Sequence, residues 1–212
     1  MFWDTARHTI GGHGMILFVN ACARGDSRTK RIAEALLQSL TAGAAGCTYN
    51  AGATGEVEEV RLCELVFPKT TEALLARRDR SIAVGDYSDS YFDLAKQFAR
   101  AETIVIAAPY WDLSFPAVLK QYIEHINVLG ITFEYTPEGF PRGLCKAKKL
   151  YYVMTAGGSY VPEEFGFGYI KTLAESFYGI KDVECIKAVG LDILGADSEN
   201  IVQNCIKGIR GV

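Results

Sequence analysis

Five strand candidates alternate with helical stretches along this chain, and this alternation constrains the fold more than any other feature. The first and third, residues 16–19 and 103–108, are short apolar runs without polar alternation, which is typical of parallel strands buried on both faces. Strands that alternate with helices favour one parallel sheet covered by helices on both sides. The right-handed crossover rule leaves few topologies, of which the flavodoxin-like order 2-1-3-4-5 is the commonest for five strands.

The pattern places each element as follows. Strands are predicted at residues 16–19, 57–62, 103–108, 149–155 and 183–189, and helices at 27–40, 89–100, 117–127, within 162–178, and at 197–209. Residues 43–55 read as a connection and 68–78 as irregular or a short helix. We predict a single domain over residues 15–212. Residues 1–14 are interpreted as a disordered extension, with an arm that packs on a partner subunit through Phe2 and Trp3 as the alternative.

Composition excludes several classes of protein. The chain has 212 residues, of which 49% are hydrophobic, and this fits one α/β domain with a large core. A net charge of −3 without a basic block argues against nucleic-acid binding. No apolar run approaches the ~20 residues that cross a bilayer, and no secretory signal is visible. The six cysteines form no C-x-x-C pair, so we expect a cytosolic protein with reduced, mostly buried thiols and no metal site.

The loop after the first strand has the chemistry of an anion site. It leads into a helix N-terminus, where free backbone N–H groups and the helix dipole favour negative charge. Ser27 and Thr29 add hydroxyl groups, and Arg24 or Arg28 can add a positive charge, so a phosphomonoester would be satisfied there. Neither a P-loop nor a G-x-G-x-x-G motif is present, which argues against a nucleoside triphosphate or a dinucleotide. The plainer interpretation is that Ser27 only caps the helix.

Two further loops follow the third and fourth strands and suit a flat ligand. Pro109 ends the third strand, and aromatic residues follow it at the sheet edge where ligands bind in this architecture. Paired glycines after the fourth strand would let a ligand approach the backbone, although an ordinary turn explains them equally well. The candidate residues of these loops are Pro109, Tyr110, Trp111, Asp112, Leu113, Thr155, Ala156, Gly157 and Gly158. One phosphate loop beside two flat-ligand loops fits FMN best.

The chain resembles the family of FMN-dependent NADH-azoreductases and NAD(P)H-quinone oxidoreductases, which has the flavodoxin-like fold. The likeness spans about residues 15–195. It is carried by the strand, loop and helix over 16–37 with Ser27-Arg28-Thr29, by Ala108-Pro109-Tyr110-Trp111-Asp112-Leu113, by Leu119-Lys120-Gln121-Tyr122-Ile123, by Gly130-Ile131-Thr132-Phe133-Glu134-Tyr135-Thr136, by Gly143-Leu144, by Thr155-Ala156-Gly157-Gly158, and by Phe177-Tyr178-Gly179-Ile180.

The resemblance implies a role for each matching residue. Ser27, Arg28 and Thr29 would hold the FMN phosphate. The residues from Tyr110 to Leu113, together with Thr155, Gly157 and Gly158, would line the isoalloxazine ring. Tyr135 and Phe177 would border the substrate cavity, partly from the second subunit of a homodimer. The family often has Asn at the position of Asp112, and residues 43–55 and 68–88 match poorly.

The resemblance therefore implies an enzyme in which FMN carries hydride from NADH or NADPH to a quinone, an azo compound or a similar electron-poor aromatic by a ping-pong mechanism. No catalytic side chain is required. The alternative is a flavodoxin-type electron carrier or a flavin-binding module without turnover, and an iron–sulfur flavoprotein is disfavoured because the cysteines are not clustered.

Some residues have plainer interpretations. Cys22 is expected to be a small filler and not a redox thiol, and His125 a packing or surface residue. Residues 77–80 read as a solvated charged face that could instead attract the phosphates of NAD(P)H. Six aromatic residues are expected at a subunit interface or over the flavin: Phe133, Tyr135, Phe140, Phe165, Phe167 and Tyr169.

Overall fold

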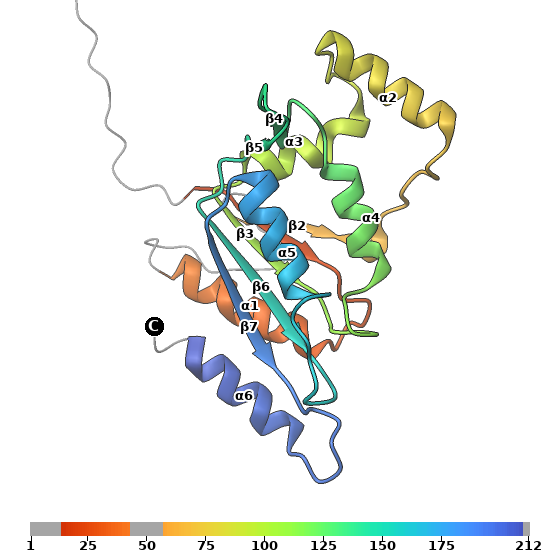
Figure 1. The fold of residues 1–212 in the computed structure, drawn as a ribbon. Coiled ribbons are helices and arrows are strands. Elements are labelled where there is room, and N and C mark those ends of the chain that lie inside the picture. Colours follow the sequence, from red (N-terminus) through yellow and green to blue (C-terminus); the bar gives the residue numbers. More distant parts are fainter. Residues whose placement is uncertain (1–13, 43–56, 210–212) are drawn as a thin grey trace, which may run out of the picture.

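A computed structural model describes residues 14–42 and 57–209 (Figure 1). The strands are β1 (Ile16–Asn20), β2 (Val57–Arg61), β3 (Thr103–Ala107), β4 (Phe133–Tyr135), β5 (Pro141–Gly143), β6 (Lys149–Thr155) and β7 (Asp182–Ala188). The α-helices are α1 (Arg28–Thr41), α2 (Glu72–Val84), α3 (Asp93–Arg100), α4 (Ala117–Ile126), α5 (Phe167–Leu173) and α6 (Ser198–Ile209). The predicted extension over 1–14, except Gly14, and the predicted connection over 43–55 lie outside the described residues.

A five-stranded parallel sheet in the order β2-β1-β3-β6-β7 forms the centre of the molecule. Since β6 and β7 are the fourth and fifth strands of this sheet in the sequence, the predicted order 2-1-3-4-5 is confirmed. Strand β3 lies in the middle, and its apolar residues are buried from Ile104 to Ala107. The edge strand β2 instead carries Glu58, Glu59 and Arg61, and charges of this kind keep an exposed edge from pairing with another sheet.

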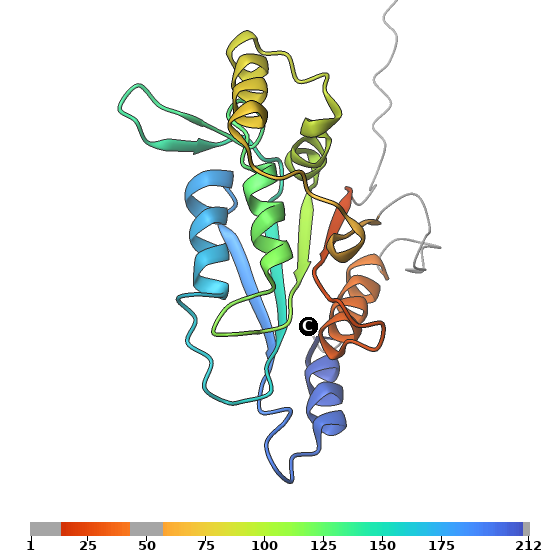
Figure 2. The ribbon, with the colours of Figure 1, turned by 90° about the vertical axis from the view of Figure 1, so that its right-hand side faces the viewer.

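Helices cover both faces of the sheet, because successive strand residues point to opposite sides. Phe18 and Val105 pack on the side of α1 and α6. Leu17, Val19 and Ile106 pack on the other side, with residues of α3, α4 and α5. Figure 2 shows the two layers from the side, with α1 and α6 on one face and α4 and α5 on the other. The fold is therefore the three-layer sandwich that the alternating pattern predicts.

The antiparallel hairpin β4–β5 was not predicted. It follows α4 and lies near the amino-terminal ends of the sheet strands, at the opposite end from the arrowheads of β6 and β7 (Figure 1). A Cβ at Gly143 would come within 2.1 Å of the carbonyl carbon of Tyr178, so the hairpin packs tightly against the segment before β7. Strands of three residues are too short for periodicity to reveal.

Helix α2 is longer than the sequence suggested. It runs from Glu72 to Val84. Thr71 caps its N-terminus, and Gly85, with φ of 68°, caps its C-terminus. A short helix or irregular chain was expected over 68–78 because the stretch shows little amphipathic pattern. The structure supplies the reason, since α2 buries none of its residues and extends away from the sheet (Figure 2).

The cysteine expectation needs correction. None of the described cysteines is buried: Cys63 is exposed, while Cys22, Cys145, Cys185 and Cys205 are half-buried. Of the six aromatic residues expected at an interface or over the flavin, Phe133 is instead buried within the protomer, while Phe167 and Tyr169 lie half-buried on α5.

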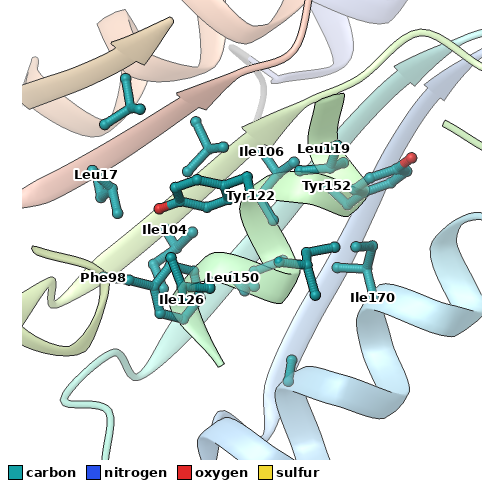
Figure 3. Close-up of a cluster of buried hydrophobic side chains, with 14 of the residues drawn as sticks. Leu17, Phe98, Ile104, Ile106, Leu119, Tyr122, Ile126, Leu150, Tyr152 and Ile170 are labelled. Carbon is teal, nitrogen blue, oxygen red and sulfur yellow. The ribbon is translucent and has the colours of Figure 1, made fainter. Parts of the chain in front are cut away.

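Two tyrosines bury their hydroxyl groups without a hydrogen-bond partner among the residues that the structure describes. Tyr122 on α4 and Tyr152 on β6 lie on the face of the sheet that α4 and α5 cover, among aliphatic side chains (Figure 3). By contrast, the hydroxyl of buried Tyr178 donates to Oδ1 of Asn127 at 2.7 Å. A buried hydroxyl without a partner costs on the order of 1–3 kcal/mol, whereas a satisfied one contributes about 1 kcal/mol.

Tyr152→Phe and Tyr178→Phe should therefore change stability in opposite directions. Removing the unpaired hydroxyl of Tyr152 should raise the free energy of unfolding by about 1 kcal/mol, and removing the paired hydroxyl of Tyr178 should lower it by a similar amount. Urea denaturation of both variants and the wild type measures the difference. Equal losses in both variants would contradict the assignment of the Tyr152 hydroxyl as unpaired.

Candidate functional site

A pocket of about 320 Å³ opens at the carboxyl-terminal edge of the sheet. Loops after β1, β3, β6 and β7 meet there because the four strands are parallel neighbours. The pocket is lined by Cys22, Ala23, Arg24, Asp26, Ser27, Arg28, Thr29, Pro109, Tyr110, Trp111, Thr155, Ala156, Gly157, Leu191 and Asp192. The structure thus brings together most of the predicted cofactor-binding residues, and leaves Asp112, Leu113 and Gly158 just outside the pocket on the same loops.

The first turn of α1 forms the polar end of the pocket. The Oγ atom of Ser27 accepts from the backbone N–H of Lys30 at 3.3 Å, which makes Ser27 the helix cap. The backbone N–H groups of Arg28 and Thr29 lie in the first turn, where an α-helix offers no carbonyl partner. Ser27 can therefore cap the helix while the free N–H groups of the first turn bind an anion, so both interpretations of this loop are compatible with the structure.

Thr29 ties the first loop to the third one. Its hydroxyl lies 2.6 Å from the hydroxyl of Thr155, and both residues are buried although 126 positions separate them. One hydroxyl donates to the other, which leaves one hydroxyl proton of the pair free to donate toward the pocket. The hydroxyl of Thr29 is thus already hydrogen-bonded within the protein. The sequence prediction had treated it as a donor available to a phosphate.

The loop after β7 contributes two pocket residues that the sequence analysis missed. Asp192 pairs with the guanidinium of Arg28 at 2.8 Å, and its backbone N–H donates to the carbonyl of Gly157 at 2.9 Å. Leu191 lines the pocket beside it. Gly190, with φ of 75° directly after a predicted strand, is the sequence signal that could have marked this loop.

The two glycines after β6 differ in their surroundings. A Cβ at Gly157 would meet Oδ2 of Asp192 at 2.5 Å, so the missing side chain makes room for another loop of the same protein. Gly157 also lines the pocket, where its predicted contact with a ligand stays a prediction. A Cβ at Gly158 would meet nothing within 4 Å, and Gly158 is not part of the pocket wall.

The loop after β3 is a tight turn with unusual backbone angles. Trp111 and Ser114 exchange two backbone hydrogen bonds, at 3.0 and 2.8 Å, around Asp112 and Leu113. These two residues have φ of 51° and 66°, as a type I′ turn requires. Asp tolerates this region but Leu does so at a cost of order 1–2 kcal/mol. The turn carries Trp111 on the pocket wall and leaves Leu113 exposed at its rim.

Side-chain hydrogen bonds hold this turn against the loop after β6. The hydroxyl of Tyr110 donates to the carbonyl of Pro162 at 3.2 Å, and that of Ser114 donates to the carbonyl of Phe165 at 2.6 Å. The Tyr110 ring is therefore fixed from both ends, since its own backbone N–H donates to Thr155. The aromatic wall of the pocket is rigid on one side.

Cys22 lies on the polar side of the pocket, and burial raises the pKa of its thiol to about 11. The thiol therefore stays protonated at neutral pH, which agrees with its interpretation as a filler. His125 lies away from the pocket, half-buried against Tyr91, and burial lowers its pKa. This placement agrees with a packing role.

The structure does not bring Tyr135 and Phe177 to this pocket. Both contact the ring of Phe133, with centroid distances of 5.5 and 5.0 Å, at the hairpin β4–β5. The hairpin lies at the opposite end of the sheet from the pocket (Figure 1). Within one protomer these two residues therefore do not line the pocket, and their contribution from a second subunit stays a prediction.

The fold and the pocket define an α/β protein that binds a small ligand at the carboxyl ends of its strands. The family of the flavodoxin-like fold matches residues 15–210, and the chain belongs to this family. Among the described residues, no helix has the length and apolar character to cross a bilayer.

Relatives and solved structures agree with this assignment. An "FMN-dependent NADH:quinone oxidoreductase" of Clostridium perfringens (strain ATCC 13124) is 45% identical over 122 residues, which is 57% of this chain and 61% of the relative. An "FMN-dependent NADH:quinone oxidoreductase 2" of Clostridium acetobutylicum is 48% identical over 53% of this chain and 58% of the relative. The matches thus span about three fifths of these relatives. The azoreductase structure from Bacillus anthracis str. Sterne has a TM-score of 0.73 and 25% identity, with 93% of this chain and 97% of that one covered.

Proposed function

We propose that the chain is an FMN-dependent oxidoreductase that takes hydride from NADH or NADPH and reduces quinones, azo compounds or similar electron-poor aromatics. The observation that carries the proposal is the pocket itself, which has a helix N-terminus with an arginine at one end and an aromatic wall at the other. The relatives named as FMN-dependent quinone oxidoreductases, together with the azoreductase structure, support the same chemistry.

The residues present fit FMN. The first turn of α1 offers two backbone donors, the hydroxyl of Ser27 and the charge of Arg28 to one phosphate group. Pro109, Tyr110 and Trp111 would flank the ring system, and the free proton of the Thr29–Thr155 pair lies between the two ends. Among the described residues of this pocket, one helix N-terminus offers an anion site, which favours a mononucleotide over a dinucleotide. Asp112, Leu113 and Gly158 would act from the rim.

The lining residues would hold FMN, which would supply hydride transfer between a nicotinamide and an electron-poor acceptor, and one cavity shared by both substrates would make the mechanism ping-pong. The chain's own residues orient and shield the ring. Tyr110 is held by the carbonyl of Pro162, and the strained turn fixes Trp111 beside it. Among the described residues no histidine lines the pocket, and the Cys22 thiol stays protonated at neutral pH. The described residues would thus supply mainly binding and orientation.

A cytosolic homodimer completes the proposal. Tyr135 and Phe177 lie too far along the sheet to serve their own pocket, so they would border the pocket of a partner subunit. Exposed aromatic residues support such an interface, since Tyr135 is 54% and Phe140 69% exposed.

Light scattering alongside quinone reduction over a dilution series should show a dimer that loses activity as it dissociates. Dissociation would remove the partner's aromatic side chains from each site, while the fold of each protomer would remain. An active monomer would contradict the shared site.

An electron carrier without a substrate of its own is the other candidate function. It needs an exposed ring edge but no walled cavity, whereas the relatives carry names of oxidoreductases. The comparisons therefore do not favour it.

The purified protein should bind FMN and oxidise NADH or NADPH when a quinone is supplied. Anaerobic titration with each nucleotide should bleach the visible absorption of the bound flavin, and a quinone should restore it. Flavin released by heat should be FMN and not FAD. Bleaching without quinone turnover would favour the carrier, and no flavin uptake would contradict the proposal.

Arg28→Ala should weaken FMN binding about fivefold or more, because it removes a charge-assisted contact with the phosphate worth on the order of 1 kcal/mol. Riboflavin lacks the phosphate, so its affinity should not change. Arg31→Ala is the matched control, since Arg31 lies one turn along the same helix, pairs with Glu199 and does not line the pocket. Fluorescence quenching measures both ligands, and equal weakening of riboflavin would place Arg28 away from the phosphate.

A further inference from the structure

A second cavity lies between α2, the segment before it and the outer side of α4. Its volume is about 430 Å³, which is within the range of small-molecule sites. It shares no residue with the pocket at the carboxyl-terminal edge. Helix α4 starts near that edge and runs back along the sheet (Figure 1). His125 lies near the C-terminus of α4, so this second cavity, called the α2–α4 cavity below, lies toward the opposite end of the sheet.

Three rings, inclined to one another, line one side of the α2–α4 cavity. The His125 ring lies 4.3 Å from the Tyr91 ring and 5.7 Å from the Phe67 ring, measured between centroids. Burial lowers the pKa of His125, so its imidazole is neutral at pH 7. A neutral aromatic wall favours a planar ring by stacking and by edge contacts.

Positive charge lies at the opening of the same cavity. Lys69 is exposed and makes no ion pair with any of the described residues. Arg78 contacts only its neighbour Asp79, at 3.0 Å, among the described acidic residues. The acidic residue in the lining, Glu124, is already paired with Lys120. The lining therefore presents a net positive charge to a ligand.

Helix α2 packs weakly on the protein, with its residue Ile82 half-buried against the core. None of its residues is buried, yet Leu74 and Leu75 face the cavity. A helix of this length is marginal without an apolar surface to pack against. An apolar ligand between α2 and α4 would supply that surface.

We propose that the α2–α4 cavity binds a planar aromatic anion, such as an aromatic carboxylate or sulfonate, with its ring against Tyr91 and His125 and its acid group near Lys69 and Arg78. The aromatic rings suit the ring of such a ligand, and the net positive charge of the lining suits its acid group. The site is separate from the proposed flavin pocket and does not depend on it.

The test uses 8-anilinonaphthalene-1-sulfonate as an anionic probe and N-phenyl-1-naphthylamine as the same ring system without the sulfonate. Fluorescence titration of the full chain should show saturable binding of the sulfonate at one site. Lys69→Ala combined with Arg78→Ala should weaken the sulfonate about fivefold or more and leave the neutral amine within about twofold.

Arg77→Ala combined with Arg80→Ala is the matched control. Both arginines belong to α2, neither lines the cavity, and the double change removes the same charge. It should leave sulfonate binding within about twofold. Saturating FMN should not displace the probe.

Three outcomes would overturn the proposal: absence of saturable binding, equal weakening by both double variants, or displacement of the probe by FMN. The first two need no flavin. If the protein bound no FMN, the proposed function would be contradicted, but the proposal for the α2–α4 cavity would not be affected.

Discussion

The parallel pairing of β3 with β1 on one side and β6 on the other is the constraint on which the rest of the molecule depends. Parallel strands end at the same edge, so each strand adds its following loop to one place. The backbone continues this pairing beyond the strands, since the N–H of Ala108 donates to Val153 and that of Tyr110 to Thr155. The loop after β3 is thus set in register with the loop after β6 before any side chain contributes.

Polar contacts then connect loops that are remote in sequence. Thr29 and Thr155 join the first loop to that after β6, and Arg28 and Asp192 join it to that after β7. The first contact is buried and fixes the helix against the sheet. The second is half-exposed and contributes little to stability, so Arg28 can exchange Asp192 for an anionic ligand at small cost. The buried Thr29–Thr155 contact is therefore structural, whereas the exposed Arg28–Asp192 pair can be exchanged.

Strain and unpaired groups are distributed unevenly over the fold. The turn at Asp112 and Leu113 holds two residues in the left-handed region beside the pocket, and its strain is offset by hydrogen bonds to the loop after β6. The unpaired hydroxyls of Tyr122 and Tyr152 lie in the core instead. Helix α2 stands apart from both, because it buries nothing within the protomer.

The sequence by itself determined the five strands of the main sheet, their order and the loops after β1 and β3. Buried parallel strands, helix caps and proline breaks act over a few residues, so their patterns can be read locally. Only the tertiary structure decided the rest. Asp192 pairs with Arg28 across 164 positions, and the missing side chain of Gly157 makes room for Asp192 at the pocket wall. Tyr135 lies in the hairpin β4–β5 at the far end of the sheet from the pocket. The sequence pattern did not reveal this, because the direction in which each element runs decides at which end of the sheet the next segment lies.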